Sequence, residues 1–107
     1  MVRGTTPTFT FRFKDETVDL SLASRVYVTF SDMNENELMT KENEDLVIDG
    51  REASIYLTQA ETLSLPGKVK VQINWLYQDG SRTKRACSKK KVINNDTNLL
   101  DKELPNG

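Results

Sequence analysis

Apolar side chains recur at every second position in several separate stretches of this chain. The first stretch places Phe9, Phe11 and Phe13 on one side of the backbone, with polar residues between them. The same alternation returns at 26–30, 46–48, 53–57 and 69–77. A period of two is typical of strands with one dry and one wet face. The pattern therefore predicts a fold made of half-buried β-strands.

Turn residues separate these stretches and predict hairpins. Asp49-Gly50 and Asp79-Gly80 are expected to be two-residue loops, because a type I′ turn needs positive φ at both central positions. Pro66-Gly67 predicts a tight turn before the longest strand. The polar segment 32–45 is expected to hold a short edge strand near 37–41. Together these features predict an all-β, immunoglobulin-like antiparallel β-sandwich of about seven strands.

One helical signal interrupts the strands. Thr58 and Glu61 have the spacing of a capping box, which predicts a short helical turn through about Leu65 that crosses from one sheet to the other. The chain has 107 residues, enough for one domain. We expect residues 1–95 to form the sandwich. Residues 96–107 are expected to form a C-terminal tail that is either flexible or docked on a partner, through Leu99, Leu100 and Leu104.

The stretch 82–91 holds six of the fifteen basic residues. If Asp79-Gly80 is the loop, Trp75 lies opposite Lys84, and the pleat divides the cations between two faces. The apolar side takes Arg82, Lys84 and Lys90, and the opposite side takes Arg85, Lys89 and Lys91. Phosphate binding favours many cations on one surface. The run is therefore interpreted as a solvated strand rather than a nucleic-acid site.

The same register places Lys70 directly opposite Lys89, a like-charge pair that destabilises a ladder. A β-bulge within 88–90 would shift the parity and remove the conflict. An acidic partner would compensate the charge instead. Lysines at a free edge also deter unwanted strand pairing. The sequence leaves these explanations open.

Little in the chain suggests catalysis. Histidine is absent and Cys87 is the single cysteine, so neither a Ser-His nor a Cys-His nucleophile can be built. The segment from Asp32 begins like a calcium loop, but Glu37 and Asn43 stand where glycine and glutamate are needed. We predict a non-enzymatic protein without catalytic, metal-binding or cofactor-binding residues, and we expect no small-molecule ligand.

Charge and hydropathy limit the partners. The formal net charge is −1, so no global field attracts nucleic acid or a membrane surface. The N-terminal stretch lacks the apolar run of a signal peptide, and a soluble protein that folds inside a cell is expected. Trp75 and Tyr77 on one strand face are more typical of a core than of a sugar platform. A carbohydrate-binding or host-adhesion module stays the first alternative, and a nucleic-acid binder that uses the basic strand stays the second.

Five stretches carry a family resemblance: RGTTPT (3–8), VYVTF (26–30), LTQAETLSL (57–65), VQINW (71–75) and DGSR (79–82). In this order and spacing the chain resembles the N-terminal domain family of phage baseplate upper proteins and similar small phage or prophage tail-region proteins. The resemblance implies a β-sandwich with a structural role in the virion, folded in the host bacterial cytoplasm. Larger family members continue into helical and receptor-facing segments, so a stand-alone protein and a fragment are both compatible with it.

The resemblance implies that the partners are other tail or baseplate proteins, or further copies of the chain. The predicted interfaces are the basic strand, the acidic segment 32–45 and the leucines of the tail. Opposite charges on the first two would suit head-to-tail contact between copies.

Overall fold

The structure, a computed structural model, describes residues 1–105. Eight strands lie in this part of the chain: β1 (Thr8–Arg12), β2 (Arg25–Ser31), β3 (Glu37–Glu42), β4 (Leu46–Asp49), β5 (Glu52–Tyr56), β6 (Lys68–Asp79), β7 (Arg82–Cys87) and β8 (Lys91–Asn94). The helical elements are α1 (Gln59–Ser64) and the short 3₁₀ segments η1 (Leu20–Leu22) and η2 (Asn43–Asp45). No helix among the described residues has the length and apolar character that crossing a bilayer requires.

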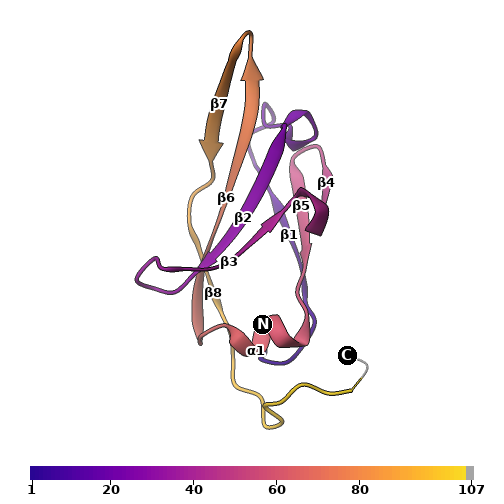
Figure 1. The fold of residues 1–107 in the computed structure, drawn as a ribbon, viewed down its shortest axis with the longest axis vertical. Coiled ribbons are helices and arrows are strands. Elements are labelled where there is room, and N and C mark those ends of the chain that lie inside the picture. The colour runs from indigo at the N-terminus through magenta and orange to yellow at the C-terminus, as the bar shows by residue number, and fades with distance from the viewer. Residues whose placement is uncertain (106–107) are drawn as a thin grey trace.

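The strands form two antiparallel sheets, which confirms the predicted all-β sandwich. One sheet has the order β1-β5-β4 and the other has the order β3-β2-β6-β7, with β8 also paired to β6. The long strand β6 therefore has β2 along one edge and β7 followed by β8 along the other (Figure 1). The structure has eight strands instead of about seven because the last basic run is split into β7 and β8.

The core lies between the two sheets and consists of the alternating residues that the period predicted. The five-stranded sheet contributes side chains such as Phe30 of β2 and Val71 of β6, and the three-stranded sheet contributes Ile55 of β5. All three are at most 2% exposed. Alternation places every second side chain on the same face of a strand, so each sheet has one continuous apolar face.

Both hairpin loops begin one residue later than predicted. Asp49 pairs with Glu52, and Asp79 pairs with Arg82, so each loop consists of a glycine and the residue after it. Gly50 and Gly80 have φ of 57° and 64°. A type II′ turn needs positive φ only at its first central position, which the glycine supplies.

The one-residue shift of each hairpin loop changes the cross-strand partner of each residue, but it keeps each side chain on its predicted face of the sheet. Leu46 lies opposite Ile55 rather than Ala53. Trp75 lies opposite Ala86 rather than Lys84. Each partner moves by two residues, and a shift of two keeps every side chain on its predicted face.

The connections between the layers leave one side of the sandwich open. The segment η2 joins β3 to β4, so the edges of the two sheets that these strands form meet on one side. At the lower end of the molecule in Figure 1, α1 joins β5 to β6. The remaining two edges are β1 in one sheet and β7 with β8 in the other. At the end of β8, Asn94 and Asp96 pair with Met1 and Val2, which precede β1. Between β1 itself and β7 or β8, no connection or hydrogen-bonded pairing occurs within residues 1–105.

The predicted capping box is confirmed at the start of α1. The backbone N–H of Glu61 donates to Thr58 Oγ1 at 3.2 Å, and the N–H of Thr58 donates to Glu61 Oε1 at 2.9 Å. Glu61 also forms an ion pair with Lys41 of β3. Partial burial raises the pKa of the Glu61 carboxyl, but Lys41 and the Thr58 amide together lower it further, so the net pKa is below its usual range.

Candidate functional site

The basic run changes register between β7 and β8. Asn74 of β6 pairs with Cys87, and Val71 pairs with Lys91. Three steps along β6 (74 − 71) thus match four steps along the partner (91 − 87), so the partner holds one extra residue. Ser88 anchors the irregular segment, because its N–H donates to Ile73 O at 2.8 Å and its Oγ accepts from Ile73 N at 2.9 Å. The β-bulge proposed from the sequence is therefore present.

The bulge reverses the predicted faces of two lysines. Lys91 lies opposite Val71, on the side that faces the other sheet, and Val92 lies opposite Lys70. Lys90 reaches the outer face instead, where it contacts Glu35. The prediction that Lys90 faces inward and Lys91 outward is wrong, because it assumed an unbroken ladder. The like-charge pair between Lys70 and Lys89 does not form.

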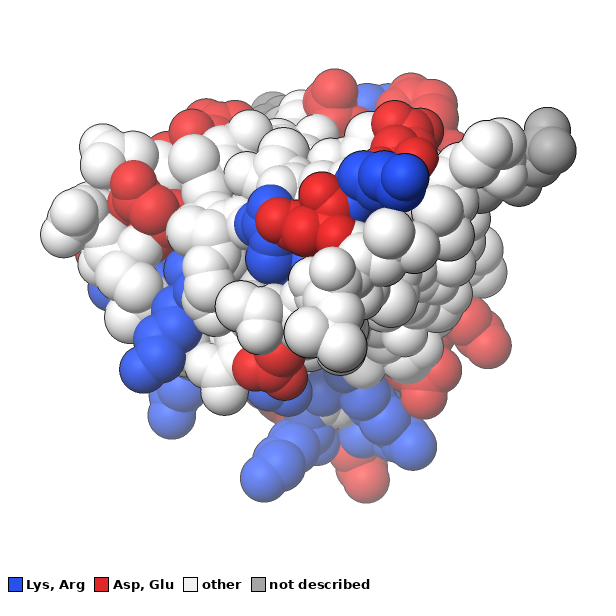
Figure 2. Space-filling view, turned by 90° about the horizontal axis from the view of Figure 1, so that it is seen from below, with Lys and Arg blue, Asp and Glu red and all other residues white. Residues whose placement is uncertain are grey.

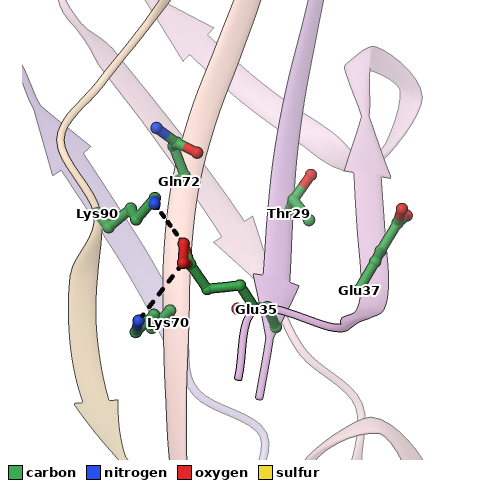
Figure 3. Close-up of a pocket in the computed structure, with 7 residues that line it drawn as sticks. Thr29, Glu35, Glu37, Lys70, Gln72 and Lys90 are labelled. Atoms are coloured by element: carbon green, nitrogen blue, oxygen red, sulfur yellow. Dashed lines mark hydrogen bonds and ion pairs between the residues drawn. The ribbon is translucent and has the colours of Figure 1, made fainter. Parts of the chain in front are cut away.

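The acidic partner suggested by the sequence is also present. Glu35 forms ion pairs with Lys90 and Lys70, the second at 3.8 Å between Oε2 and Nζ (Figure 3). The hydrogen bond from Lys90, followed by the positive charge of both lysines, lowers the pKa of the Glu35 carboxyl. Glu35 has φ of 66°, a left-handed conformation that is uncommon for a residue other than glycine. These residues, with Gln72 and Thr29, line a polar pocket of about 260 Å³.

Other acidic side chains of the segment 32–45 are also paired within the chain. Glu42 and Glu44 both form ion pairs with Arg25 of β2, at 3.2 and 2.9 Å. Asp32 accepts from the N–H groups of Asn34 and Asn36, which closes a tight loop. In residues 1–105 no group of three or more His, Cys, Asp or Glu side chains is arranged to hold a metal ion. Glu35, Glu42 and Glu44 are thus engaged by cations of the chain itself.

The remaining predicted cations all lie on β7 and do not line the pocket around Glu35. Arg82, Lys84 and Arg85 are exposed on β7, the hairpin strand that projects at the top of Figure 1. Lys84 pairs with Asp79 at 2.6 Å, and Arg85 donates to Asn74 on the outer face at 3.1 Å. At the opposite end of the molecule, acidic and basic side chains are interspersed (Figure 2).

A groove of about 580 Å³ lies at the open side of the sandwich, between β1 and the segment that joins β7 to β8. Its apolar floor combines Phe11 and Phe13 with Val71 and Ile73 of the opposite sheet. Its rim carries five cations and no carboxylate: Arg12, Lys14, Lys89, Lys90 and Lys91. We call this feature the basic groove. It brings together two segments that are far apart in the sequence.

Three of the rim cations have no ion pair. Arg12 approaches Glu52 at 3.8 Å, and Lys90 is held by Glu35. Lys14, Lys89 and Lys91 are exposed and have no carboxylate within ion-pair distance in the described part of the chain. The groove therefore has a local positive charge that the chain itself leaves uncompensated.

The β1 wall of the groove is a free strand edge. The N–H of Phe13 donates to Arg51 O, and Pro7 O accepts from Leu57 N, so the backbone groups of the odd-numbered residues point toward β5. Peptide groups alternate in direction along a strand, so those of Thr10 and Arg12 point away from β5 toward the open edge. No backbone hydrogen bond from either residue to another segment occurs within residues 1–105.

The C-terminal tail is docked on the chain itself as far as the structure describes it. Arg3 contacts Asp101 at 3.1 Å. The side chain of Gln59 in α1 accepts from Leu104 N at 2.8 Å and donates to Leu104 O at 3.4 Å. Leu104 and Leu100 are 45% and 48% exposed, whereas Leu99 is fully exposed. Of the predicted interface leucines, Leu99 alone projects completely into solvent.

Trp75 and Tyr77 are neither fully buried nor displayed as an open platform. The Trp75 ring packs edge-on against Phe13, with centroids 5.0 Å apart. Both aromatic residues line a hollow of about 420 Å³ that also contains Asp19 and Gln78. Both residues are half-buried, and Trp75 packs against the core, so the prediction of a core residue is confirmed in part for Trp75 alone.

Sequence reasoning selected Lys89, Lys90 and Lys91 but missed the other half of the groove. Nothing in the local pattern distinguishes Phe11 from an ordinary core residue or Lys14 from a solvated one. Comparisons with family models, with curated proteins and with solved structures found no match to this chain.

Proposed function

We propose that the chain is a non-enzymatic structural component of a phage or prophage tail or baseplate that acts through protein–protein contacts. The observation that carries this proposal is the basic groove, where an apolar floor and unpaired cations lie beside a free strand edge. Free edges and exposed apolar floors are the features through which β-sandwiches bind other chains. The resemblance to baseplate upper proteins supplies the tail context.

The partners would be other tail or baseplate proteins, or further copies of the chain, and the location would be the virion. The proposal assigns no role to catalysis, since the sequence has no histidine and a single exposed cysteine. Head-to-tail pairing of copies through the acidic segment 32–45 and the basic strand, which the sequence suggested, has little support from the structure. Glu35, Glu42 and Glu44 already have cationic partners within the chain.

The test is to ask whether the protein is part of a virus particle. Particles from the host that carries the gene are purified on a density gradient and examined by mass spectrometry and by immunogold labelling. The proposal expects the chain in intact particles, with gold at the tail end. Particles that lack the chain, or that carry it only on the head, would overturn the tail assignment.

One observation favours the carbohydrate-binding alternative as a second candidate. Trp75 and Tyr77 share a hollow with Asp19 and Gln78, a combination of aromatic faces and hydrogen-bonding groups that suits a sugar ring. Titration with bacterial surface polysaccharides, followed by Trp75 fluorescence, would test it. A saturable spectral shift that Tyr77→Ala removes would favour adhesion, and an unchanged spectrum would count against it.

A further inference from the structure

We propose that the basic groove binds an extended acidic segment of a partner protein, which adds to the free edge of β1 as an extra strand. This inference rests on the proposed function, since it names the kind of partner that the interaction module takes. The partner segment would alternate apolar and acidic residues. Its apolar side chains would pack on the floor, and its carboxylates, on the other face of the added strand, would lie beside Arg12 and Lys14.

The backbone of β1 is arranged for strand addition. The peptide groups of Thr10 and Arg12 point away from β5 and have no backbone partner in residues 1–105. An added strand would hydrogen-bond to these groups, which is how extended peptides bind sheet edges. The opposite wall, around Lys89, is displaced by the bulge and leaves room between the sheets.

The floor matches one face of an extended segment. Phe11 and Phe13 are only half-buried, although Val71 and Ile73 beneath them are at most 2% exposed. The phenylalanines remain accessible because no strand covers this side of the sandwich. Successive apolar residues of an added strand lie on one face, so alternate side chains would reach this floor.

Charge complementarity selects an acidic occupant. Lys14, Lys89 and Lys91 have no carboxylate partner in the described chain, and the groove lining contains no acid. The acidic residues of the chain itself are poor candidates for this place, since Glu35 is paired on the outer face and Asp101 is held by Arg3. Lysines at a free edge can also serve only to deter unwanted strand pairing. In that case an acidic segment would not be repelled, but it would bind without a preferred position.

The experiment uses the purified chain and a fluorescently labelled synthetic peptide of about eight residues that alternates valine and glutamate. A peptide that alternates valine and lysine is the matched control. Binding is measured by fluorescence anisotropy at low salt, and the site is mapped by amide chemical shifts. We expect micromolar binding of the acidic peptide alone, with shifts confined to 8–14 and 88–91. Equal binding of both peptides, no binding, or shifts elsewhere would overturn the inference.

Two pairs of variants test the charge and the edge separately. Arg12→Glu with Lys14→Glu should weaken binding by about tenfold or more, because both positions lie on the face of β1 that the carboxylates of the added strand would share, and two attractions become repulsions. Lys68→Glu with Lys102→Glu makes the same change in net charge away from the groove and should alter binding by less than about twofold. Equal losses in the two double variants would mean that only net charge matters, and would refute the site.

The edge is tested at Thr10. Thr10→Pro removes the N–H that points into the groove without removing a bond to β5, and should abolish binding. Thr10→Val removes the same hydroxyl but keeps the N–H, and should bind like the unmodified chain. Circular dichroism confirms that each variant folds. Retained binding by a folded Thr10→Pro variant would exclude strand addition.

The two proposals fail in different ways. If the chain is present in virus tails but the acidic peptide does not bind, the inference about the groove is wrong and the tail role stands. If the peptide binds as expected but the chain is absent from virions, the groove is a docking site in a protein that is not a tail component.

Discussion

Asn95 connects the start of the tail to the end of α1, and its replacement gives the sharpest test of the fold. The residue is 2% exposed. Its side-chain amide donates to the carbonyl oxygens of Thr62 and Leu65, at 2.9 and 3.1 Å. Its backbone N–H donates to Gly67 O at 2.8 Å. The Asn95 side chain thus supplies hydrogen-bond donors to carbonyls at the helix end, which lack intrahelical partners.

Asn95→Asp keeps the shape of the side chain but removes both donors. Thr62 O is left without this partner, which costs about 1–3 kcal/mol, whereas Leu65 O keeps the hydrogen bond from Arg3 Nη1 at 2.9 Å and loses less. The added negative charge is buried among carbonyl oxygens and increases the loss. Asn95→Ala loses the same bonds but also removes Oδ1, which has no partner in the described structure, and should cost less. A domain of this size has a total stability of about 5–15 kcal/mol, so either change should be easily measured.

The measurement is urea unfolding at pH 7, followed by the fluorescence of Trp75. Asn94→Asp is the control, because Asn94 is exposed and the charge change is identical; it should stay within about 0.5 kcal/mol of the unmodified chain. For Asn95→Asp, burial should raise the pKa of the new carboxyl in the folded state. Its defect should therefore be full above that pKa and smaller near pH 4, where the protonated carboxyl regains one donor. An Asn95→Asp variant as stable as Asn94→Asp at pH 7 would refute this reasoning.

Three further predictions concern the core, a charge and a turn. Phe30→Ala should lower the free energy of unfolding by about 3–5 kcal/mol in urea titrations, because the ring is fully buried. Glu61→Gln should make stability less dependent on pH. Because the pKa of Glu61 is lowered on folding, its contribution to stability is present above the ordinary pKa of 4.5 and is lost as the pH falls, which acid titrations of both proteins would show. Gly80→Ala should lower the melting temperature, at a cost of about 1 kcal/mol, because φ is 64°, whereas Gly67→Ala, at a position without positive φ, should cost less; equal effects would contradict this.

Local pattern was sufficient to predict most of the elements. The alternation of Val26, Val28 and Phe30 predicted both the strand and its buried face, because extended backbone turns every second side chain to the same side. The pair Thr58 and Glu61 predicted α1 because a capping box depends only on residues three apart. The hairpin loops were placed one residue early, since an Asp-Gly pair signals a turn without stating which of its residues stands first.

The sequence also contained the conflict that led to the bulge. A regular ladder would have paired Lys70 with Lys89, so some irregularity or some acid was needed nearby. The structure has both, because Ser88 anchors an extra residue and Glu35 approaches from the segment 32–45. Sequence reasoning could not choose between the two explanations, since Glu35 is more than fifty residues distant from Lys90 (90 − 35 = 55) and only folding brings them together.

The chain by itself determined which segments are strands and which side of each is dry, since both follow from the two-residue period of the extended backbone. The arrangement of those strands in two layers decided which edges are covered. Because η2 joins β3 to β4, whereas β1 itself does not pair with β8 in the described residues, Phe11 and Lys14 lie across the open side from Lys89 and Lys91. A period describes the neighbours of a residue along one strand, and the basic groove depends on neighbours that belong to the other sheet.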